Sequence, residues 1–301
     1  MGKKITTVPS FTMEETTNPN VMRFVDRHGD WTHYFLVKEQ KFVKAVNHVL
    51  SLGYSKGPQF RAYLESHTKE EIAKTLNERG DEGSRTHMAI RDLIKGLKIT
   101  MSTKYPTELR GGRMEALNDD EWENVQAWIE WCERYQPRRI AFEDTIACID
   151  FAGTLDGLFV ITVPSGDKVF EKPFWGKDVL LLPDWKSSSA IWSEYEAQTA
   201  AYWSMVKHDP RFEKFVKTYA GRIFTGVVRL GTLHASGWQF EVWDQKYTEG
   251  EHMRRFEAAR VIADRHEPEF NPKVEEIPTQ FFIKIPKAKV APIKTTKKLP
   301  I

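Results

Sequence analysis

The chain has 301 residues, 41% of them hydrophobic, so it can bury one large core or two smaller ones. Its 44 Lys and Arg against 42 Asp and Glu leave a net charge of +2, which predicts no strong global attraction to a polyanion. Two cysteines, Cys132 and Cys148, are too few for a four-cysteine iron–sulfur cluster or a disulfide-rich scaffold. No apolar run approaches the about 18 residues of a membrane span, so we expect a soluble protein of the reducing cytoplasm.

The first third of the chain is predicted to be helical after a polar start. Residues 1–30 are polar and turn-rich, and we interpret them as a loosely held arm that leads into a mixed helical segment reaching about residue 65. Thr68 and Glu71 form a capping box that begins a short helix, which Gly80 is predicted to end. This N-terminal part is therefore expected to be a helical addition to whatever domain follows.

Two further helices are predicted before the first strand. One carries His87 on or beside its buried stripe, at helical spacing from Ile90, Ile94 and Leu97. The other begins near Asn118 and stops before Pro137. Its inward positions are predicted to be Trp122, Val125, Ile129 and Cys132.

After Pro137 the sequence pattern changes from that of helices to that of strands. Runs rich in Val, Ile, Phe and Thr, separated by turn signals, predict strands at 138–149, 154–163 and 178–182. A helix over about 190–207, with Ser187, Ser188 and Ser189 available as caps, precedes two more strands and a last amphipathic helix. The order in the middle of the chain is therefore helix, strand, strand, strand, helix, strand. From residue 267 the chain becomes a Lys- and Pro-rich tail with little expected structure.

Charged residues gather at the ends of two predicted strands. Asp156 stands in GTLDGL, where flanking glycines let the backbone pass close to another group. Asp184 and Lys186 are two residues apart on the third strand, so their side chains point to one face of the sheet. Paired carboxylates suit a hard divalent ion such as Mg²⁺, and a lysine beside it can orient water and offset charge on a phosphate. This set predicts phosphodiester hydrolysis.

Residues on neighbouring elements can complete the site. Gln198 and Tyr202 are four apart on the helix that follows, so they share a face and can reach the same cleft. His87 can supply an imidazole ligand, and Glu143 on the first strand a further carboxylate, although a strand-edge charge explains Glu143 equally well.

The motifs GSRTH, GTLD, DWK and QTAAY, in this order on this topology, resemble the PD-(D/E)XK nuclease superfamily in its RecB-type exonuclease branch. The resemblance covers residues 80–230. It implies metal binding by His87, Asp156 and Asp184 with the backbone carbonyl of Trp185, and it makes Lys186 the catalytic lysine. It also implies that Gln198 and Tyr202, the helix motif, orient the residues of the site and contact DNA.

The resemblance implies an α/β fold with a restriction-endonuclease-like core, a mixed sheet flanked by helices, and helical additions at both ends. We accordingly expect an arm and helical segment over 1–65, a nuclease domain over 66–266 and the tail over 267–301. The expected cofactor is Mg²⁺ or Mn²⁺, with no iron–sulfur cluster and, because no GxxxxGK[ST] loop is present, no ATP.

The expected function is a metal-dependent exonuclease on linear DNA, of the stand-alone kind that phages use in recombination, repair or end processing. It would act in the cytoplasm of a prokaryotic or phage-infected cell, and a single-strand annealing or helicase partner and an oligomer are both compatible with it. Two alternatives remain open: an endonuclease of the restriction or junction type, and a catalytically inactive DNA-binding or scaffolding module. Cleavage polarity and the choice between DNA and RNA stay open too.

Overall fold

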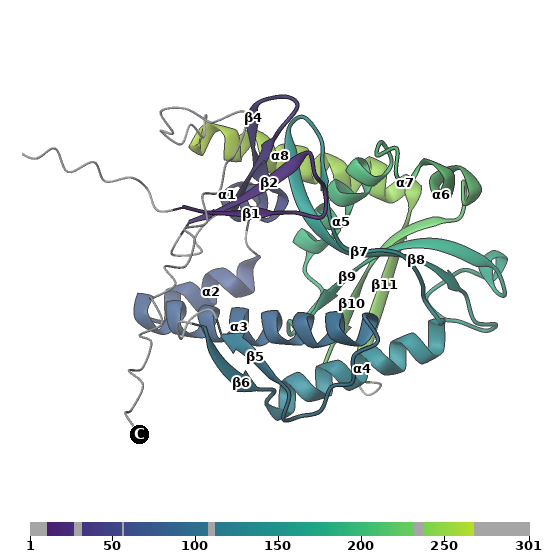
Figure 1. Ribbon diagram of the computed structural model, residues 1–301, viewed down its shortest axis with the longest axis horizontal. Helices are drawn as coiled ribbons and strands as arrows, with labels where there is room; N and C mark the ends of the chain where they lie inside the picture. Colours follow the sequence, from purple (N-terminus) through teal and green to yellow (C-terminus); the bar gives the residue numbers. More distant parts are fainter. Residues whose placement is uncertain (1–10, 27–31, 56, 108–111, 232–236, 268–301) are drawn as a thin grey trace, which may run out of the picture. The chain divides into compact units, whose positions relative to one another are not determined.

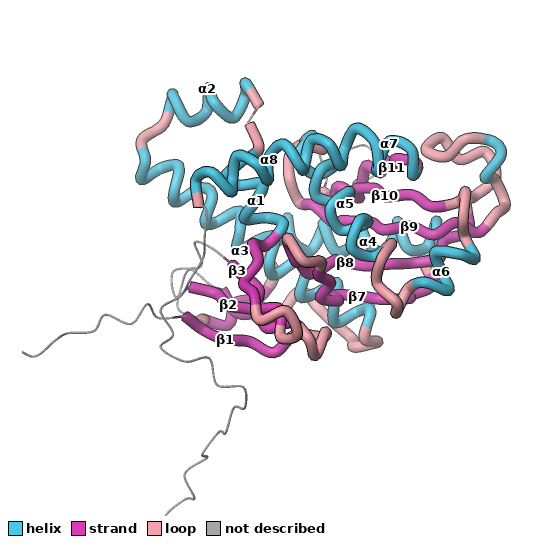
Figure 2. The backbone as a smooth tube through the Cα atoms, turned by 90° about the horizontal axis from the view of Figure 1, so that it is seen from above, coloured by secondary structure: helices cyan, strands magenta, loops and turns pink. Residues whose placement is uncertain are grey.

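A computed structural model of the chain describes residues 11–26, 32–55, 57–107, 112–231 and 237–267. The predicted tail from residue 268 onward and the first ten residues of the predicted arm lie outside these ranges. Helices flank a large mixed sheet, which confirms the α/β class (Figure 1). Figure 2 shows the strands β7 to β11 side by side.

Within the described residues, nine strands form the main sheet. Their bounds are β1 Phe11–Glu15, β2 Val21–Asp26, β3 Thr32–Leu36, β4 Lys41–Ala45, β7 Arg138–Ala147, β8 Phe151–Thr162, β9 Asp178–Lys186, β10 Ile223–Leu230 and β11 Trp238–Asp244. A separate two-stranded sheet pairs β5 Lys104–Thr107 with β6 Arg113–Ala116.

Helices connect and cover these strands. Their bounds are α1 Val46–Gly53, α2 Pro58–Ser66, α3 Lys69–Ile94, α4 Asp119–Tyr135, α5 Ser193–Val206, α6 Glu213–Thr218, α7 Gln245–Tyr247 and α8 Met253–His266, with a short 3-10 turn at Lys172–Phe174 and a π turn at Thr248–His252. The elements α4, β7, β8, β9, α5 and β10 follow one another as the sequence predicts.

The sheet has a hydrophobic core on each face. One core joins the sheet to α1, α5 and α8 and includes Val49, Trp203 and Phe256. The other joins the sheet to α3 and α4 and includes Ile90 and Trp131. Figure 1 shows α5 and α8 on one side of the strands and α3 and α4 on the other. Side chains alternate between the two faces along each strand, so neighbouring residues of one strand serve different cores.

One edge of β8 is shared by two strands. The other edge pairs with β7 from Ala152 to Val160, with an irregularity near Arg139. On the shared edge, β9 pairs antiparallel only with Phe159–Thr162, and β4 pairs parallel only with Phe151 and Ala152. Between these two pairings, no strand of the described part of the chain lies beside residues 153–158 of β8 on this edge. A strand edge without a neighbour leaves backbone groups open to side chains or ligands.

The prediction for residues 11–45 is wrong. In place of an arm and a helical segment, these residues supply β1 to β4, which pair in order and join the main sheet through β4. Among the described residues before 67, only α1 and α2 are helical. Each strand has five or six residues, and the strands become stable by pairing with one another and with β8, which local patterns do not report.

Several helix predictions need correction. The capping box of Thr68 and Glu71 is confirmed, but α3 runs through Gly80 without a break. The limits of α4 are confirmed, whereas Ile129 on it is exposed, and Trp131 faces inward instead. The helix α5 begins after Trp192, and no side chain caps it, so the predicted serine caps are wrong.

Candidate active site

The backbone of Trp185 is the centre of the candidate site. Its N–H donates a hydrogen bond of 2.9 Å to Asp156 Oδ2, and His87 Nε2 lies 3.2 Å from its carbonyl oxygen. Both groups point across the gap that β9 leaves when it separates from β8. The side chains of Asp156 on β8 and His87 on α3 therefore satisfy backbone groups of Trp185 that a neighbouring strand would otherwise satisfy.

Asp156 and His87 also lie close to each other. Asp156 Oδ1 is 3.7 Å from His87 Nδ1, and both side chains are partly exposed. The carboxylate comes from the part of β8 that lacks a neighbour on one edge, and the imidazole from the C-terminal third of α3. Two residues 69 positions apart in sequence thus lie close together in the fold.

Asp184 and Lys186 form a close ion pair. Lys186 Nζ lies 2.6 Å from Asp184 Oδ2, which confirms that both side chains occupy one face of the strand. Lys186 Nζ also lies 4.9 Å from the centre of the Tyr195 ring, a cation–π distance. The Trp185 side chain between them points the other way and is buried among Trp128 and Trp131.

Burial and charge set the ionisation of this pair. Burial raises the pKa of Asp184 to about 6, against the attraction of Lys186 and with a further rise from Asp156. Burial would lower the pKa of Lys186, but Asp184 and Asp156 outweigh it and hold that pKa above its usual value. At neutral pH Asp184 is thus ionised and Lys186 is protonated.

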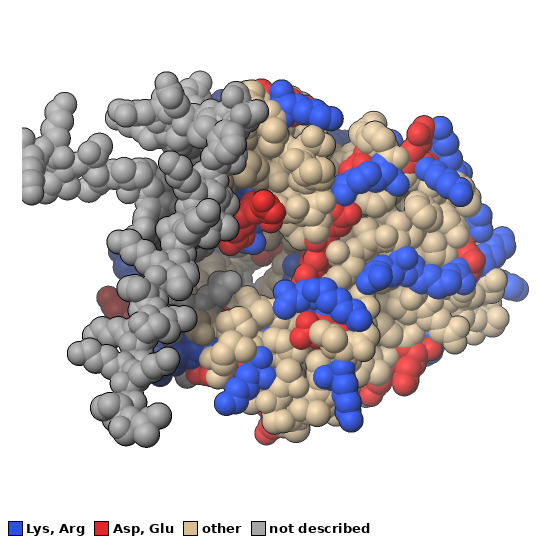
Figure 3. Space-filling view, in the orientation of Figure 1, with Lys and Arg blue, Asp and Glu red and all other residues tan. Residues whose placement is uncertain are grey.

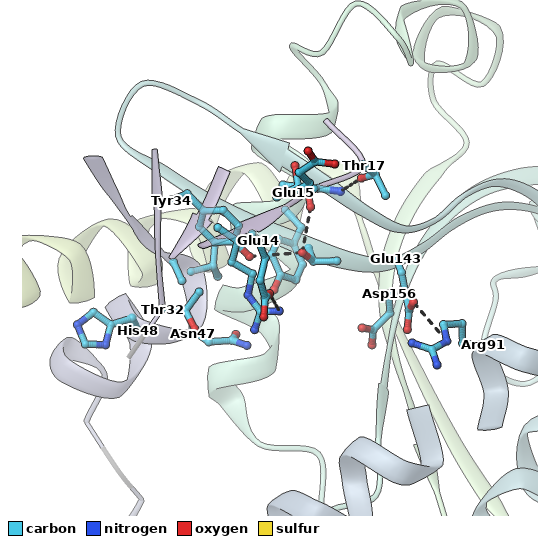
Figure 4. Close-up of a pocket in the computed structure, with 18 of the residues that line it drawn as sticks. Glu14, Glu15, Thr17, Thr32, Tyr34, Asn47, His48, Arg91, Glu143 and Asp156 are labelled. Atoms are coloured by element: carbon cyan, nitrogen blue, oxygen red, sulfur yellow. Dashed lines mark hydrogen bonds and ion pairs between the residues drawn. The ribbon is translucent and has the colours of Figure 1, made fainter. Parts of the chain in front are cut away.

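Glu143 and Arg91 extend the site into a pocket of about 600 Å³. Glu143 lies on β7 between Phe142 and Asp144, whose partners Gly157 and Leu155 flank Asp156 on β8. Its backbone has a φ of 43°, a left-handed conformation that costs free energy in a residue with a side chain. Its Oε2 is 4.0 Å from Arg91 Nε. Burial raises the pKa of Glu143, and Arg91 opposes the rise. Figure 4 shows Glu143, Asp156 and Arg91 together at one end of the pocket.

Gln198 and Tyr202 are buried on α5, which packs against the sheet. Gln198 Nε2 lies 3.3 Å from the Tyr202 hydroxyl, and both side chains are less than 10% exposed. Tyr202 packs against Gly153 so closely that a Cβ there would lie 2.6 Å from the ring. Burial raises the pKa of Tyr202 well above its usual value, and the Asp184 charge adds to the rise. The hydroxyl therefore stays protonated.

The candidate site is bordered by two pockets. Asp156, Glu143 and Tyr202 line the one already described, whereas Lys186 and Tyr195 line a second one beside residues 187–189. On the face drawn in Figure 3, acidic and basic side chains stand side by side around a hollow, so this face shows both signs of charge.

The expected metal ligands gather only in part. His87, Asp156 and the Trp185 carbonyl lie close together, whereas the Asp184 carboxylate is engaged by Lys186. Among the described residues, His87, Asp156 and Asp184 do not place three ligand atoms within 4.8 Å of one another. The chemistry of three of them nevertheless fits a hard divalent ion, because two carboxylates and a carbonyl oxygen are donors that such an ion prefers.

Two residues near the site are not among those that the sequence patterns predict. Arg91 lines the pocket, and Tyr195 touches Lys186. Helical spacing offers a signal for both, because Arg91 is one turn after His87 and Tyr195 is one turn before Gln198.

Compared with known proteins, the chain matches no family model, and no curated protein sequence is significantly similar to it. Within the residues that the structure describes, no helix combines the length and the apolar character needed to cross a membrane.

Proposed function

We propose that this chain is a metal-dependent nuclease that hydrolyses phosphodiester bonds in DNA, acting as an exonuclease on linear DNA in recombination, repair or end processing. The observation that supports it is the meeting of His87, Asp156 and the Asp184–Lys186 pair around the Trp185 peptide. Resemblance of the four motifs to RecB-type PD-(D/E)XK nucleases points to the same chemistry.

The residues that would hold Mg²⁺ or Mn²⁺ are His87, Asp156, Asp184 and the carbonyl of Trp185. When bound, such an ion supplies an activated water and stabilises the leaving oxygen of the phosphodiester. Asp156 is suited to ligation because one of its oxygens is fixed by the Trp185 amide while the other faces His87. A ligand held in this way needs little reorganisation when the ion arrives.

Lys186 would act through its charge. Because Asp184 and Asp156 hold the pKa of Lys186 above its usual value, the ammonium does not act as a general base at neutral pH. It can donate hydrogen bonds to the attacking water and to the phosphate oxygens, where negative charge increases in the transition state. Arg91 can make a similar contact to a neighbouring phosphate from the pocket side.

Gln198 and Tyr202 would support the site from α5. Their burial leaves little surface for DNA, so their part in the proposed mechanism is to fix the position of neighbouring groups. Tyr202 packs directly against β8 at Gly153, three residues before Asp156, and its protonated hydroxyl accepts from Gln198. A rigid contact at this point determines where the Asp156 carboxylate lies.

The proposal is tested with purified protein, Mg²⁺ or Mn²⁺, and three DNA substrates: end-labelled linear duplex, linear single strand and closed circles. We expect metal-dependent degradation of linear DNA with closed circles left intact. Cleavage of the circles would replace the exonuclease with an endonuclease. Binding without cleavage of any substrate, in either metal, would overturn the enzyme proposal in favour of an inactive binding module.

A further inference from the structure

A second group of ligating side chains lies outside the candidate active site. His33 on β3, His48 on α1 and Glu267 at the end of α8 place three ligand atoms within 4.8 Å of one another. His48 Nε2 is 2.7 Å from Glu267 Oε2, and the two imidazole rings have their centres 5.1 Å apart. Both histidines are buried, and Glu267 is half-buried.

The fold holds these three residues in place. The strand β3 pairs with β4, which leads directly into α1. The helices α1 and α8 touch at Gly53, where a Cβ would lie 1.9 Å from the carbonyl oxygen of Ala259. So close an approach leaves little room for sliding, and it fixes His48 relative to Glu267.

The lysine beside the cluster is engaged by another carboxylate. Lys44 is the partner of His33 across the strands β3 and β4. Its ammonium is engaged by Asp264 at 2.8 Å, which leaves Glu267 to the histidines.

We propose that His33, His48 and Glu267 bind a transition-metal ion, with Zn²⁺ as the species that fits best. Two imidazoles and one carboxylate are a donor set that zinc prefers, whereas Mg²⁺ prefers oxygen donors and water. Three protein ligands leave a position for water. The bound ion joins the N-terminal strands to the last described helix, so it stabilises the fold.

This site is separate from the candidate active site. His48 lies at one end of the pocket in Figure 4, and Asp156 and Glu143 lie at the other. The two sites also differ in donors, since oxygen atoms dominate around Asp156. Zinc binding at the histidine cluster therefore does not depend on the proposed nuclease activity.

The test uses the full chain carrying Asp156→Asn, which removes a ligand from the candidate active site. After treatment with a chelator and its removal, Zn²⁺ is titrated by calorimetry and the thermal unfolding midpoint is followed. We expect one equivalent of Zn²⁺ to bind and the midpoint to rise. Co²⁺ in place of Zn²⁺ should give the visible absorption of a low-coordinate site with nitrogen ligands.

Glu267→Gln is the informative variant, because Glu267 is half-buried and the change keeps its shape. We expect at least about tenfold weaker Zn²⁺ binding and loss of the rise in midpoint. The matched control is Glu257→Gln, a change of another carboxylate on α8 whose partner is Arg260, and it should bind Zn²⁺ unchanged. Circular dichroism verifies that both variants are folded. Absence of Zn²⁺ binding, or equal binding by folded Glu267→Gln, would overturn the proposal.

Discussion

Lys186 Nζ lies 2.6 Å from Asp184 Oδ2, although only 2% of the Asp184 side chain and 20% of the Lys186 side chain are exposed. Burial raises the pKa of Asp184 to about 6 even though Lys186 opposes the rise, so the charge of Asp184 at neutral pH depends on Lys186. Removing one partner of such a pair leaves the other buried without compensation. The pair therefore contributes to stability as well as to the proposed chemistry.

Lys186→Met should abolish cleavage and also destabilise the protein. We expect activity to fall by about 10²-fold or more, since a charge aimed at the transition state is lost. The free energy of unfolding should fall by about 1–3 kcal/mol at neutral pH, because Asp184 must either stay charged alone or take up a proton. Below about pH 6 Asp184 is neutral in both proteins, so the difference in urea unfolding should shrink there.

The control for this prediction is the double variant Asp184→Asn with Lys186→Met. Removing both charges should restore most of the lost stability while cleavage stays absent. A double variant as unstable as Lys186→Met would contradict the role given to the ion pair.

Gly153→Ala should displace Tyr202 and, through β8, the Asp156 carboxylate. The new Cβ would lie 2.6 Å from Cε1 of Tyr202, so the ring must move away from its contact with Gln198. We expect a loss of about 1–3 kcal/mol in stability and, because β8 carries Asp156, a loss of about tenfold or more in cleavage rate. Thermal unfolding and a cleavage assay measure the two effects. Gly57→Ala, with no atom within 4 Å of its Cβ, should change neither by a comparable amount.

Gly80→Ala should stabilise the protein. Gly80 lies inside α3, and a Cβ there meets no atom within 4 Å. Alanine in a helix interior is about 0.5–1 kcal/mol more favourable than glycine. Chemical denaturation should therefore show an increase of this size in the free energy of unfolding. A decrease would mean that the helix ends at this glycine, as the sequence pattern suggests.

Asp167→Asn should destabilise the fold far from the site. Burial alone would raise the pKa of Asp167, but hydrogen bonds from Arg134, the amides of Val169 and Phe170, and Tyr135 outweigh it and hold the pKa below 3.8. This stabilisation is present above pH 3.8 and is lost as the pH falls through the lower folded value. We expect a deficit of about 1–3 kcal/mol at neutral pH in urea unfolding. A deficit that persists unchanged in strong acid would contradict this account.

Local signals in the sequence predict much of the core but little of the N-terminal part. The capping box at Thr68 and Glu71 and the order of α4, β7, β8, β9, α5 and β10 depend on neighbouring residues, and both are confirmed. The strands β1 to β4 depend on pairing that reaches β8, more than 100 residues away, and no short pattern reports such pairing. The helix also continues through Gly80, where the local pattern predicts its end; the residues just before this glycine are exposed, and Asp81 and Arg85 beyond it are buried.

The candidate site is predictable in its residues more than in its geometry. The spacing of Asp184 and Lys186 places them on one face, and the structure agrees. The gap along β8 that brings Asp156 to the Trp185 peptide arises because β9 and β4 pair with different ends of one strand. The left-handed backbone of Glu143 likewise depends on tertiary packing.

The most direct test of the proposed nuclease compares the unmodified protein with Asp156→Asn. Asparagine keeps an oxygen that can accept from the Trp185 amide, so the fold should be retained while the charge facing His87 is lost. The measurement is the release of label from the ends of linear DNA in Mn²⁺, with a chelator as the control. We predict release by the unmodified protein that the chelator abolishes and that Asp156→Asn lowers by about 10²-fold or more. Equal release by folded Asp156→Asn would contradict the assignment.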